Sequence, residues 1–457
     1  MLPESVTAYL DAHRQEHLEK LKEFLAFPSV ANVTAEPDPC EQCARWLAEH
    51  AGQLGFDAEV VPTDTKPAVL GELIVDEKLP TILVYGHYDV QPPEPLELWE
   101  SGPFQAEVRD GNLYARGAED NKGQLWTHLM AIDALRNTVG LPVNIKLFFE
   151  GEEEIGSPCA EAFLTKHKDR LKADYCVISD SQFFAADVPS IIYSLRGLTY
   201  FELTLTGPNQ DLHSGLNGGA VGNPINALAK MIAAMHDENG RIMLPGFYDD
   251  VIPLTAEERA TWESLPFDES EYAASMGLDA LTGGEKGYSA LERSWARPTL
   301  DCNGIVGGYT AEGSKTIIPS KAHAKISCRL VPNQDPEKIV QSVRAFIEEQ
   351  TPEGFTVEMK VNAEARPVMI PTGSPAIEAS RRAMDYAFEK ETALIRCGAS
   401  VPVTEVIQRV LGIDAVLMGF GLPDDNIHAP NEKFALDCLY RGSKASAAFM
   451  CSLPELM

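Results

Sequence analysis

The first 195 residues alternate between short apolar runs and longer segments with helical periodicity. Runs rich in Val, Ile and Leu, each with the length of a buried strand, occupy residues 68–75, 81–86, 144–150 and 175–179. Between these runs, residues 122–137 and 159–171 repeat apolar side chains at the spacing of a helix. Strands that alternate with helices predict a mostly parallel sheet with helices on both faces.

The pattern changes around residue 196. Residues 200–207 alternate as an exposed antiparallel strand does, and residues 223–240 have the pattern of a helix. A long polar stretch at about 245–297 is expected to be irregular. It is followed by segments typical of a strand, a helix and a strand, at residues 323–331, 337–350 and 354–362. A sheet with helices on one face accounts for this part of the chain.

The α/β rhythm returns from about residue 373. Helices are predicted at residues 375–391, 403–412 and 432–451, and strands at residues 392–396 and 413–421. We therefore expect an α/β fold in which one discontinuous domain, residues 1–195 and 373–457, is interrupted by a smaller α+β domain. The inserted domain would comprise residues 196–372.

Composition narrows the class of protein. A chain of 457 residues, with 44% hydrophobic and 23% charged residues, is typical of a soluble globular protein with more than one core. The net charge of −30, from 38 basic and 68 acidic residues, argues against a nucleic-acid partner. No apolar run approaches the length of a membrane span, and the first residues do not have the pattern of a secretory signal. The nine scattered cysteines favour a reducing, cytoplasmic location.

Two short motifs near the start of the chain do not indicate a site. Cys40 and Cys43 form a C-x-x-C, but there is no second pair, and residues 40–55 have the pattern of a helix. His13 and His17 match the zinc-protease pattern H-x-x-E-H. The surrounding segment, residues 11–24, is charged on most sides and is expected to be an exposed amphipathic helix.

Histidines and acidic residues gather where the predicted strands end. They are His87 and Asp89, the run from Glu150 to Glu154, Asp180, and His428, with Asp120 in a turn before a helix. Each residue alone has a structural explanation, such as a helix cap or a turn. In open α/β sheets, however, functional groups collect at the carboxyl ends of the strands. Mixed His and carboxylate ligands without cysteine suit zinc, manganese or cobalt.

Eight motifs in these regions resemble those of a known family. They are GHYDVQP (86–92), RGAEDNKG (116–123), EGEEEIGS (150–157), SD (179–180), DLHSGLNGG (211–219), SCRLVP (327–332), GASVPVTEV (398–406) and IHAPNEKF (427–434). In this order they resemble the dinuclear metallopeptidases that include carnosinase, cytosolic nonspecific dipeptidase, aminoacylase and succinyl-diaminopimelate desuccinylase. The first and fifth motifs are most similar to the carnosinase and nonspecific dipeptidase branch.

The resemblance implies a site with two divalent metal ions, Zn or Mn. His87 and Asp180 would bind one ion, Glu154 and His428 the other, and Asp120 would bridge the two. Asp89 would orient the imidazole of His87. The family also implies a cis peptide bond between residues 120 and 121.

The three adjacent glutamates would then have different roles. Glu153 would be the general base that takes a proton from water held between the metals and later protonates the leaving amine. Glu154 would be a metal ligand, and Glu152 would be a solvated neighbour without a role.

The resemblance also places residues of the inserted domain in the site. His213 would stabilise the oxyanion from the partner subunit of a homodimer, which makes the insert a lid and dimerisation domain. The substrate's terminal carboxylate would be bound by Arg329, Thr316, Gly398 and Ser400. Residues 397–400 depart from the family's pattern of an acidic residue followed by two glycines. This departure affects what the resemblance implies about substrate preference, but not what it implies about the metal chemistry.

The expected function is that of a cytoplasmic, metal-dependent dipeptidase for dipeptides or short peptides with a free carboxyl terminus. An N-acyl-amino-acid deacylase on the same dinuclear site is the alternative. A non-catalytic binding or assembly protein would lack the base or a ligand, whereas all five ligands and Glu153 are present.

Overall fold

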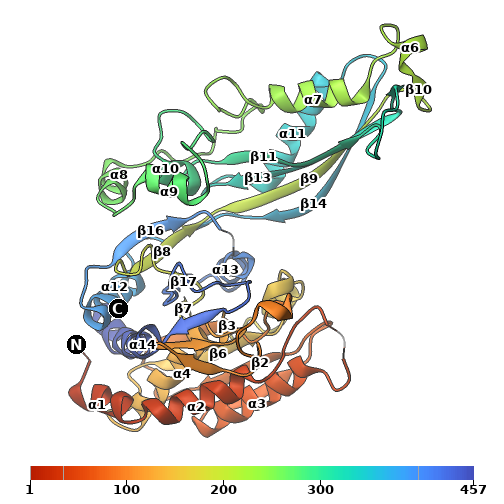
Figure 1. The fold of residues 1–457 in the computed structure, drawn as a ribbon. Helices are drawn as coiled ribbons and strands as arrows, with labels where there is room; N and C mark the ends of the chain where they lie inside the picture. Colours follow the sequence, from red (N-terminus) through yellow and green to blue (C-terminus); the bar gives the residue numbers. More distant parts are fainter. Residues whose placement is uncertain (1, 34, 400) are drawn as a thin grey trace. The chain divides into compact units, whose positions relative to one another are not determined.

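The computed structural model describes residues 2–33, 35–399 and 401–457. The described chain forms two compact units (Figure 1). The first comprises the residues up to Tyr193 together with Ile370–Ile395 and Pro402–Met457. The second comprises Ser194–Met369 and Arg396–Val401, of which Ser400 lies outside the described residues.

The first unit is built on a sheet with a parallel centre. Its strands lie in the order β1 (Asp57–Val61), β2 (Ala68–Leu73), β6 (Asn144–Glu150), β3 (Thr81–His87), β7 (Tyr175–Ile178), β17 (Asp414–Leu417) and β8 (Ser190–Leu195), and β16 (Ala393–Cys397) also pairs with β8. Strands β6, β3, β7 and β17 are parallel, whereas β1, β2 and β8 pair antiparallel with their neighbours. The carboxyl ends of the four parallel strands therefore share one edge, and the predicted mostly parallel sheet is confirmed.

Helices cover both faces of this sheet, as predicted (Figure 1). One face carries α1 (Glu4–Ala12), α2 (Arg14–Leu25), α3 (Pro39–Gln53), α4 (Lys122–Arg136), α12 (Pro375–Phe388) and α14 (Leu436–Leu456). Against the other lie α5 (Ala160–Lys166), α13 (Pro402–Val406) and the π-helical turn Ile407–Leu411. Phe163 of α5 stacks on Phe148 of β6, with ring centroids 5.2 Å apart. Burial on both faces explains why β6 is apolar along most of its length.

The chain start differs from the expected single exposed helix. Helix α1 ends at Ala12 and α2 begins at Arg14, with His13 between them. One side of α2 is buried, and the ring of His17 lies 3.0 Å from the Asp133 carboxylate. Among the described residues, the groups able to hold a metal do not include either histidine of the H-x-x-E-H motif. Cys40 and Cys43 are buried free thiols on α3, so the predicted helix there is confirmed.

The second unit contains an antiparallel sheet with helices packed on one face. The strand order is β11 (Thr299–Gly307), β13 (Lys321–Leu330), β9 (Gly197–Thr206) and β14 (Thr356–Ala365). Every second residue of β9 and β13 is buried. These residues, with α7 (Pro224–Ala234) and α11 (Pro336–Gln350), form a core that includes Phe201, Leu203, Leu205, Leu228, Met231, Ile339, Val343 and Phe346.

The polar stretch expected to be irregular contains three short helices. They are α8 (Ala256–Glu263), α9 (Glu269–Ser275) and α10 (Ala290–Trp295). Thr255 with Glu258, and Ser289 with Glu292, form capping boxes that satisfy the first backbone donors of α8 and α10. Such caps stabilise helices that are too short to show apolar periodicity, which is why the sequence pattern missed them.

Smaller elements complete the fold. Strand β10 (Leu212–His213) pairs with β12 (Ile317–Ile318) and leads into α6 (Ser214–Asn217). Strand β15 (Val368–Met369) pairs with the end of β8. A small sheet joins β4 (Glu107–Arg109), β5 (Asn112–Tyr114) and β18 (Lys433–Ala435), and 3₁₀ turns occupy Leu96–Leu98 and Glu153–Ile155. Within the described chain, none of the helices combines the length and apolar character needed to cross a membrane.

Candidate metal centre

The carboxyl edge of the parallel strands collects the predicted metal ligands. His87 is the last residue of β3, Asp180 follows β7, and Glu154 lies in the 3₁₀ turn after β6. His428 lies in the loop after β17, and Asp120 in the loop before α4. All five belong to the first unit. The fold therefore brings together side chains that are separated by up to 341 residues in sequence (428 − 87).

The five side chains form two groups that share Asp120. In each group, His87–Asp120–Asp180 and Asp120–Glu154–His428, the ligand atoms lie within 4.8 Å of one another. Nε2 of His87 is 3.1 Å from one oxygen of Asp120 and 3.7 Å from Asp180. Nε2 of His428 is 2.9 Å from the other oxygen of Asp120 and 3.3 Å from Glu154. A carboxylate between two groups is the arrangement that a bridging ligand requires.

The chemistry of these atoms fits a pair of divalent cations. Nε2 of His87 and Oε1 of Glu154 are buried without a hydrogen-bond partner. Buried polar atoms are normally paired, so unpaired ones facing a shared centre are available to bind a cation. Imidazole nitrogens and carboxylate oxygens are ligands of zinc and manganese.

The electrostatics of the group point the same way. Burial opposes a charge on His87, but Asp180, Asp120 and Asp89 raise its pKa well above the usual value. Hydrogen bonds from the His428 ring to the carboxylates of Asp120 and Glu154 raise the pKa of His428 to about 10. Although burial opposes ionisation of Asp120, contacts with both histidines lower its pKa. The strongly negative field that favours a proton on each imidazole equally favours a metal cation in its place.

Asp89 links the two halves of the centre. Its carboxylate lies 3.3 Å from Nδ1 of His87. The same carboxylate accepts hydrogen bonds from the backbone N–H groups of Glu153 and Glu154, at 3.2 and 3.0 Å. Asp89 is fully buried. Besides its contact with the imidazole, it thus holds the turn that carries both glutamates.

Two residues that the sequence argument did not consider also contact the ligands. The side chain of Asn121 donates to Asp180 at 2.9 Å and accepts from the backbone N–H of His87 at 3.3 Å. The peptide bond between Asp120 and Asn121 is cis, as the resemblance implies. Gln91 donates to the Glu154 carboxylate at 2.8 Å. Asn121 directly follows the predicted ligand Asp120, and Gln91 lies in the same motif as His87, which was the only signal available.

The three adjacent glutamates have different surroundings. Glu154 belongs to the metal-capable group. Glu153 is partly buried, and burial together with Asp180 and Asp120 raises its pKa well above the usual value. The expectation that Glu152 is solvated is wrong, because it is only 2% exposed. Its carboxylate accepts from the backbone N–H of Cys159 at 2.7 Å and from the hydroxyl of Thr65, so it is a structural acceptor.

The remaining predicted residues belong to the second unit. Pairing of β10 with β12 places His213 opposite Ile317, beside Thr316, whose carbonyl accepts from Ser214 at 3.0 Å. Arg329 lies on β13 opposite Thr299 and Leu198. The carbonyl of Gly398 accepts from the guanidinium of Arg196 at 2.9 Å. Ser400 lies outside the described residues, and the roles of all five residues stay predictions.

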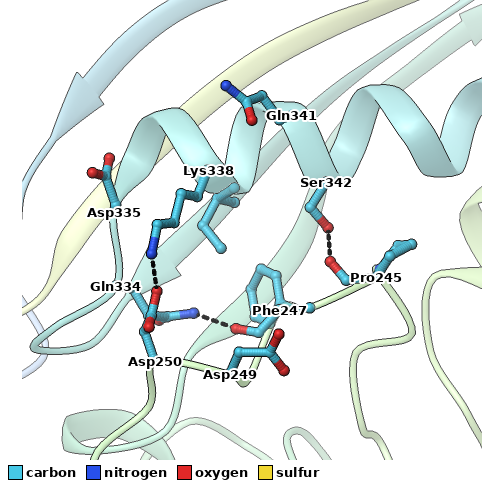
Figure 2. A pocket seen from close by; sticks show the side chains of 11 residues that line it. Pro245, Phe247, Asp249, Asp250, Gln334, Asp335, Lys338, Gln341 and Ser342 are labelled. Atoms are coloured by element: carbon cyan, nitrogen blue, oxygen red, sulfur yellow. Dashed lines mark hydrogen bonds and ion pairs between the residues drawn. The ribbon is translucent and has the colours of Figure 1, made fainter.

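A separate hollow lies in the second unit, between residues 245–250 and the first half of α11 (Figure 2). Its polar side chains bind one another: Lys338 pairs with Asp250 at 2.8 Å, and Gln334 donates to the Phe247 carbonyl at 2.7 Å. Neither of the metal-capable groups found among the described residues includes its side chains. The metal centre therefore remains the candidate functional site.

Known proteins similar to this chain share both its length and its fold. Residues 83–452 match the family model described as peptidase family M20/M25/M40. The human Beta-Ala-His dipeptidase is 33% identical, covering 100% of this chain and 93% of the human chain. The Cys-Gly metallodipeptidase of Candida albicans is 31% identical, covering 96% and 94% of the two chains.

Solved structures of related proteins have the same fold over almost the whole chain. The M20 family metallo-carboxypeptidase Sso-CP2 from Sulfolobus solfataricus superposes with a TM-score of 0.84 at 36% identity, covering 96% of this chain and 99% of the other. Human carnosine dipeptidase 1 gives a TM-score of 0.79 at 31% identity, and both chains are covered completely, at 100%.

Proposed function

Because this chain belongs to peptidase family M20/M25/M40, we propose that it is a metal-dependent dipeptidase acting on dipeptides or short peptides with a free C-terminal carboxylate. The observation that carries the proposal is the pair of metal-capable groups that share Asp120. The names of the human and Candida albicans relatives support the substrate class. Retention of every proposed ligand argues against a non-catalytic role.

The first unit supplies the ligands. His87 and Asp180 would hold one metal ion, Glu154 and His428 the other, and Asp120 would bridge them, with Zn or Mn as the ions that this donor set suits. Bound divalent cations polarise a scissile carbonyl and lower the pKa of water. Asp89 and Asn121 would orient the ligands by the contacts described above.

Glu153 is proposed as the general base. Its carboxylate would accept a proton from the attacking water while the water oxygen forms a bond to the amide carbon. As the C–N bond breaks, the same proton would pass to the leaving nitrogen, which departs as an amine. The position of Glu153 supports this role, because its backbone and that of the ligand Glu154 are held by the same carboxylate, Asp89.

Residues of the second unit are proposed to bind the substrate. Arg329, Thr316, Gly398 and Ser400 would contact the terminal carboxylate, and His213 would stabilise the oxyanion from a partner subunit. A guanidinium suits bidentate binding of a carboxylate. Burial, and repulsion by the neighbouring Arg329, lower the pKa of Arg196 to about 10, and Arg196 also bonds to Gly398. A region with two guanidinium groups favours an anionic ligand.

The proposal includes a homodimer formed by the inserted domain. Strand β11 is one of the two edge strands of the second unit's sheet, and Ile305, Val306 and Tyr309 are exposed on it and just beyond it. An exposed apolar edge strand is a surface that natural proteins usually cover. A cytoplasmic location is proposed from the cysteines, all nine of which are free.

A substrate panel tests the substrate class. Metal-loaded protein would be given dipeptides, longer peptides, and N-acetyl and N-succinyl amino acids under the same conditions. We expect the highest kcat/KM for dipeptides. Faster turnover of the acylated amino acids would replace the proposal with the deacylase alternative, and faster turnover of longer peptides would favour a carboxypeptidase such as the Sulfolobus relative.

A further inference from the structure

Glu432 is a buried carboxylate with no part in the chemistry described so far. It follows the ligand His428 by four residues, in the loop that leads into β18. Its exposure is 0%. Burying a carboxylate is costly unless every acceptor site finds a donor, so its partners show what the position requires.

All the donors to Glu432 come from one loop, the one that carries Asp120. One carboxylate oxygen accepts from the backbone N–H groups of Glu119 and Asp120, at 3.0 and 3.1 Å. The other accepts from the N–H of Gly117 at 3.0 Å and from the guanidinium of Arg116 at 2.7 Å. Each oxygen therefore has two donors, and one of them is the backbone N–H of the bridging residue.

The segment that contains Glu432, residues 428–432, also fixes the backbone at His428. The backbone of His428 has a positive φ of 58°, and that of Asn431 one of 60°, a left-handed conformation that few non-glycine residues adopt and that is commonest for Asn, Asp and His. Asn431 bonds to the backbone at Leu98 and Glu100, and the carbonyl of Glu432 accepts from Ala115 at 3.2 Å. Residues 428–432 thus join one ligand to the loop of another.

We propose that Glu432 is a positioning residue that holds the Asp120 loop against the His428 loop, and that it thereby sets the affinity of the dinuclear centre for metal. The inference rests on the proposed function, since it takes the Asp120 groups as metal sites. It predicts a specific effect. With this carboxylate, the two loops hold Nε2 of His428 2.9 Å from the Asp120 carboxylate. Without it, the loops no longer fix this distance, and part of the free energy of metal binding is used to bring the ligands together.

Substitution E432Q tests the proposal. Glutamine keeps the shape but removes the charge, and its NH₂ group meets N–H donors where an acceptor is needed. The matched control is D425N. Asp425 is also 0% exposed and in the same loop, but it bonds to Leu422 and Lys433 instead of the Asp120 loop. The full chains would be stripped of metal and titrated with Zn²⁺ in competition with a chromophoric chelator.

We expect the wild-type protein to bind two equivalents, E432Q to bind at least one of them about 10–100-fold more weakly, and D425N to stay within about threefold of wild type. A variant that only lost stability would have a lower unfolding temperature in the metal-free state and unchanged Zn²⁺ affinity. That result overturns the inference, as does an equal loss in D425N.

Two further outcomes remain separable. A wild-type protein that binds no Zn²⁺ contradicts the proposed function itself, whereas a normal wild type with a normal E432Q contradicts only the role of Glu432. If E432Q does not fold, E432D decides the matter. It keeps the charge for Arg116 but is one methylene too short to reach all the backbone donors, so wild-type Zn²⁺ affinity in E432D overturns the inference.

Discussion

At the scale of single residues, the run Glu152–Glu154 shows how neighbours acquire separate roles. A strand end followed by a 3₁₀ turn directs consecutive side chains to different surroundings. Glu154 faces Asp120 and His428, whereas Glu152 binds Thr65 and Cys159. The adjacent carboxylates are tolerated because Glu152 and Glu154 have separate partners rather than a shared solvent face.

The substitution Glu153→Gln tests the proposed base. Glutamine cannot accept the proton, so we expect kcat for dipeptide hydrolysis to fall by about 10²–10⁴-fold while KM and metal content remain close to wild type. The control is Glu152→Gln, which alters the adjacent structural acceptor and should leave kcat within about threefold. Steady-state kinetics with elemental analysis of both variants would give the answer. Similar kcat values for Glu153→Gln and wild type would remove Glu153 from the mechanism.

The limits of the sequence are clearest for residues that act through backbone contacts. His87 and Asp180 could be predicted because they lie at or just past the ends of apolar strands, and ligand chemistry is a side-chain property. The burial of Glu152 could not, because its partners, Thr65 and Cys159, lie elsewhere in the chain and one of them is a backbone N–H. Glu432 was missed for the same reason, since three of its four donors are backbone groups.

At the scale of elements, His128 of α4 joins the helices to the metal-binding edge. Its ring is 2.8 Å from the hydroxyl of Ser179, next to Asp180, and 2.9 Å from the hydroxyl of Ser446 on α14. The Ser179 hydroxyl is 2.6 Å from the carbonyl of Met418 and donates to it. Nε2 of His128 must therefore donate to Ser179. Because burial lowers the pKa of His128 to about 3, the ring is neutral near pH 7, and Nδ1 then accepts from the Ser446 hydroxyl.

The substitution His128→Gln should change the pH dependence of stability. Burial lowers the pKa of His128 to about 3, whereas the unfolded chain takes up the proton near pH 6.5. Between these values the unfolded state binds more protons, so falling pH destabilises the wild type by about 1.4 kcal/mol per unit. The variant lacks this contribution. Urea unfolding of the metal-free proteins from pH 7 to 5 should show the unfolding free energies of wild type and His128→Gln converging. If the two free energies change in parallel with pH, the buried His128 does not make this contribution.

Regular elements were predictable to the extent that apolar periodicity reports burial. The strands at residues 81–87 and 144–150 and helix α4 were predicted almost to their ends. The pattern failed where local capping replaces apolar burial, as in α8 and α10. It also missed the break at His13, since helical periodicity continues through it. Pairing of β10 with β12 was not predictable, because two-residue strands have no pattern.

At the scale of the whole molecule, the proposed dimer follows from the second unit's exposed edge. A dimer of the 49.9 kDa chain would sediment at about twice that mass. Replacing Ile305 and Val306 with Asp, which puts charge on β11 without touching a metal ligand, should shift the protein to monomer. Analytical ultracentrifugation at micromolar concentration would show this. A wild-type protein that stays monomeric would contradict the dimer and the action of His213 from a partner.

Peptide hydrolysis is proposed to depend on two metal ions held around Asp120. The most direct measurement is dipeptide hydrolysis by chelator-stripped full-length protein as Zn²⁺ or Mn²⁺ is added back, with bound metal counted by elemental analysis. We predict no measurable hydrolysis in the stripped protein, and activity that rises to a plateau at about two equivalents per chain. Undiminished hydrolysis by verified metal-free protein, or no hydrolysis after full loading, would contradict the account.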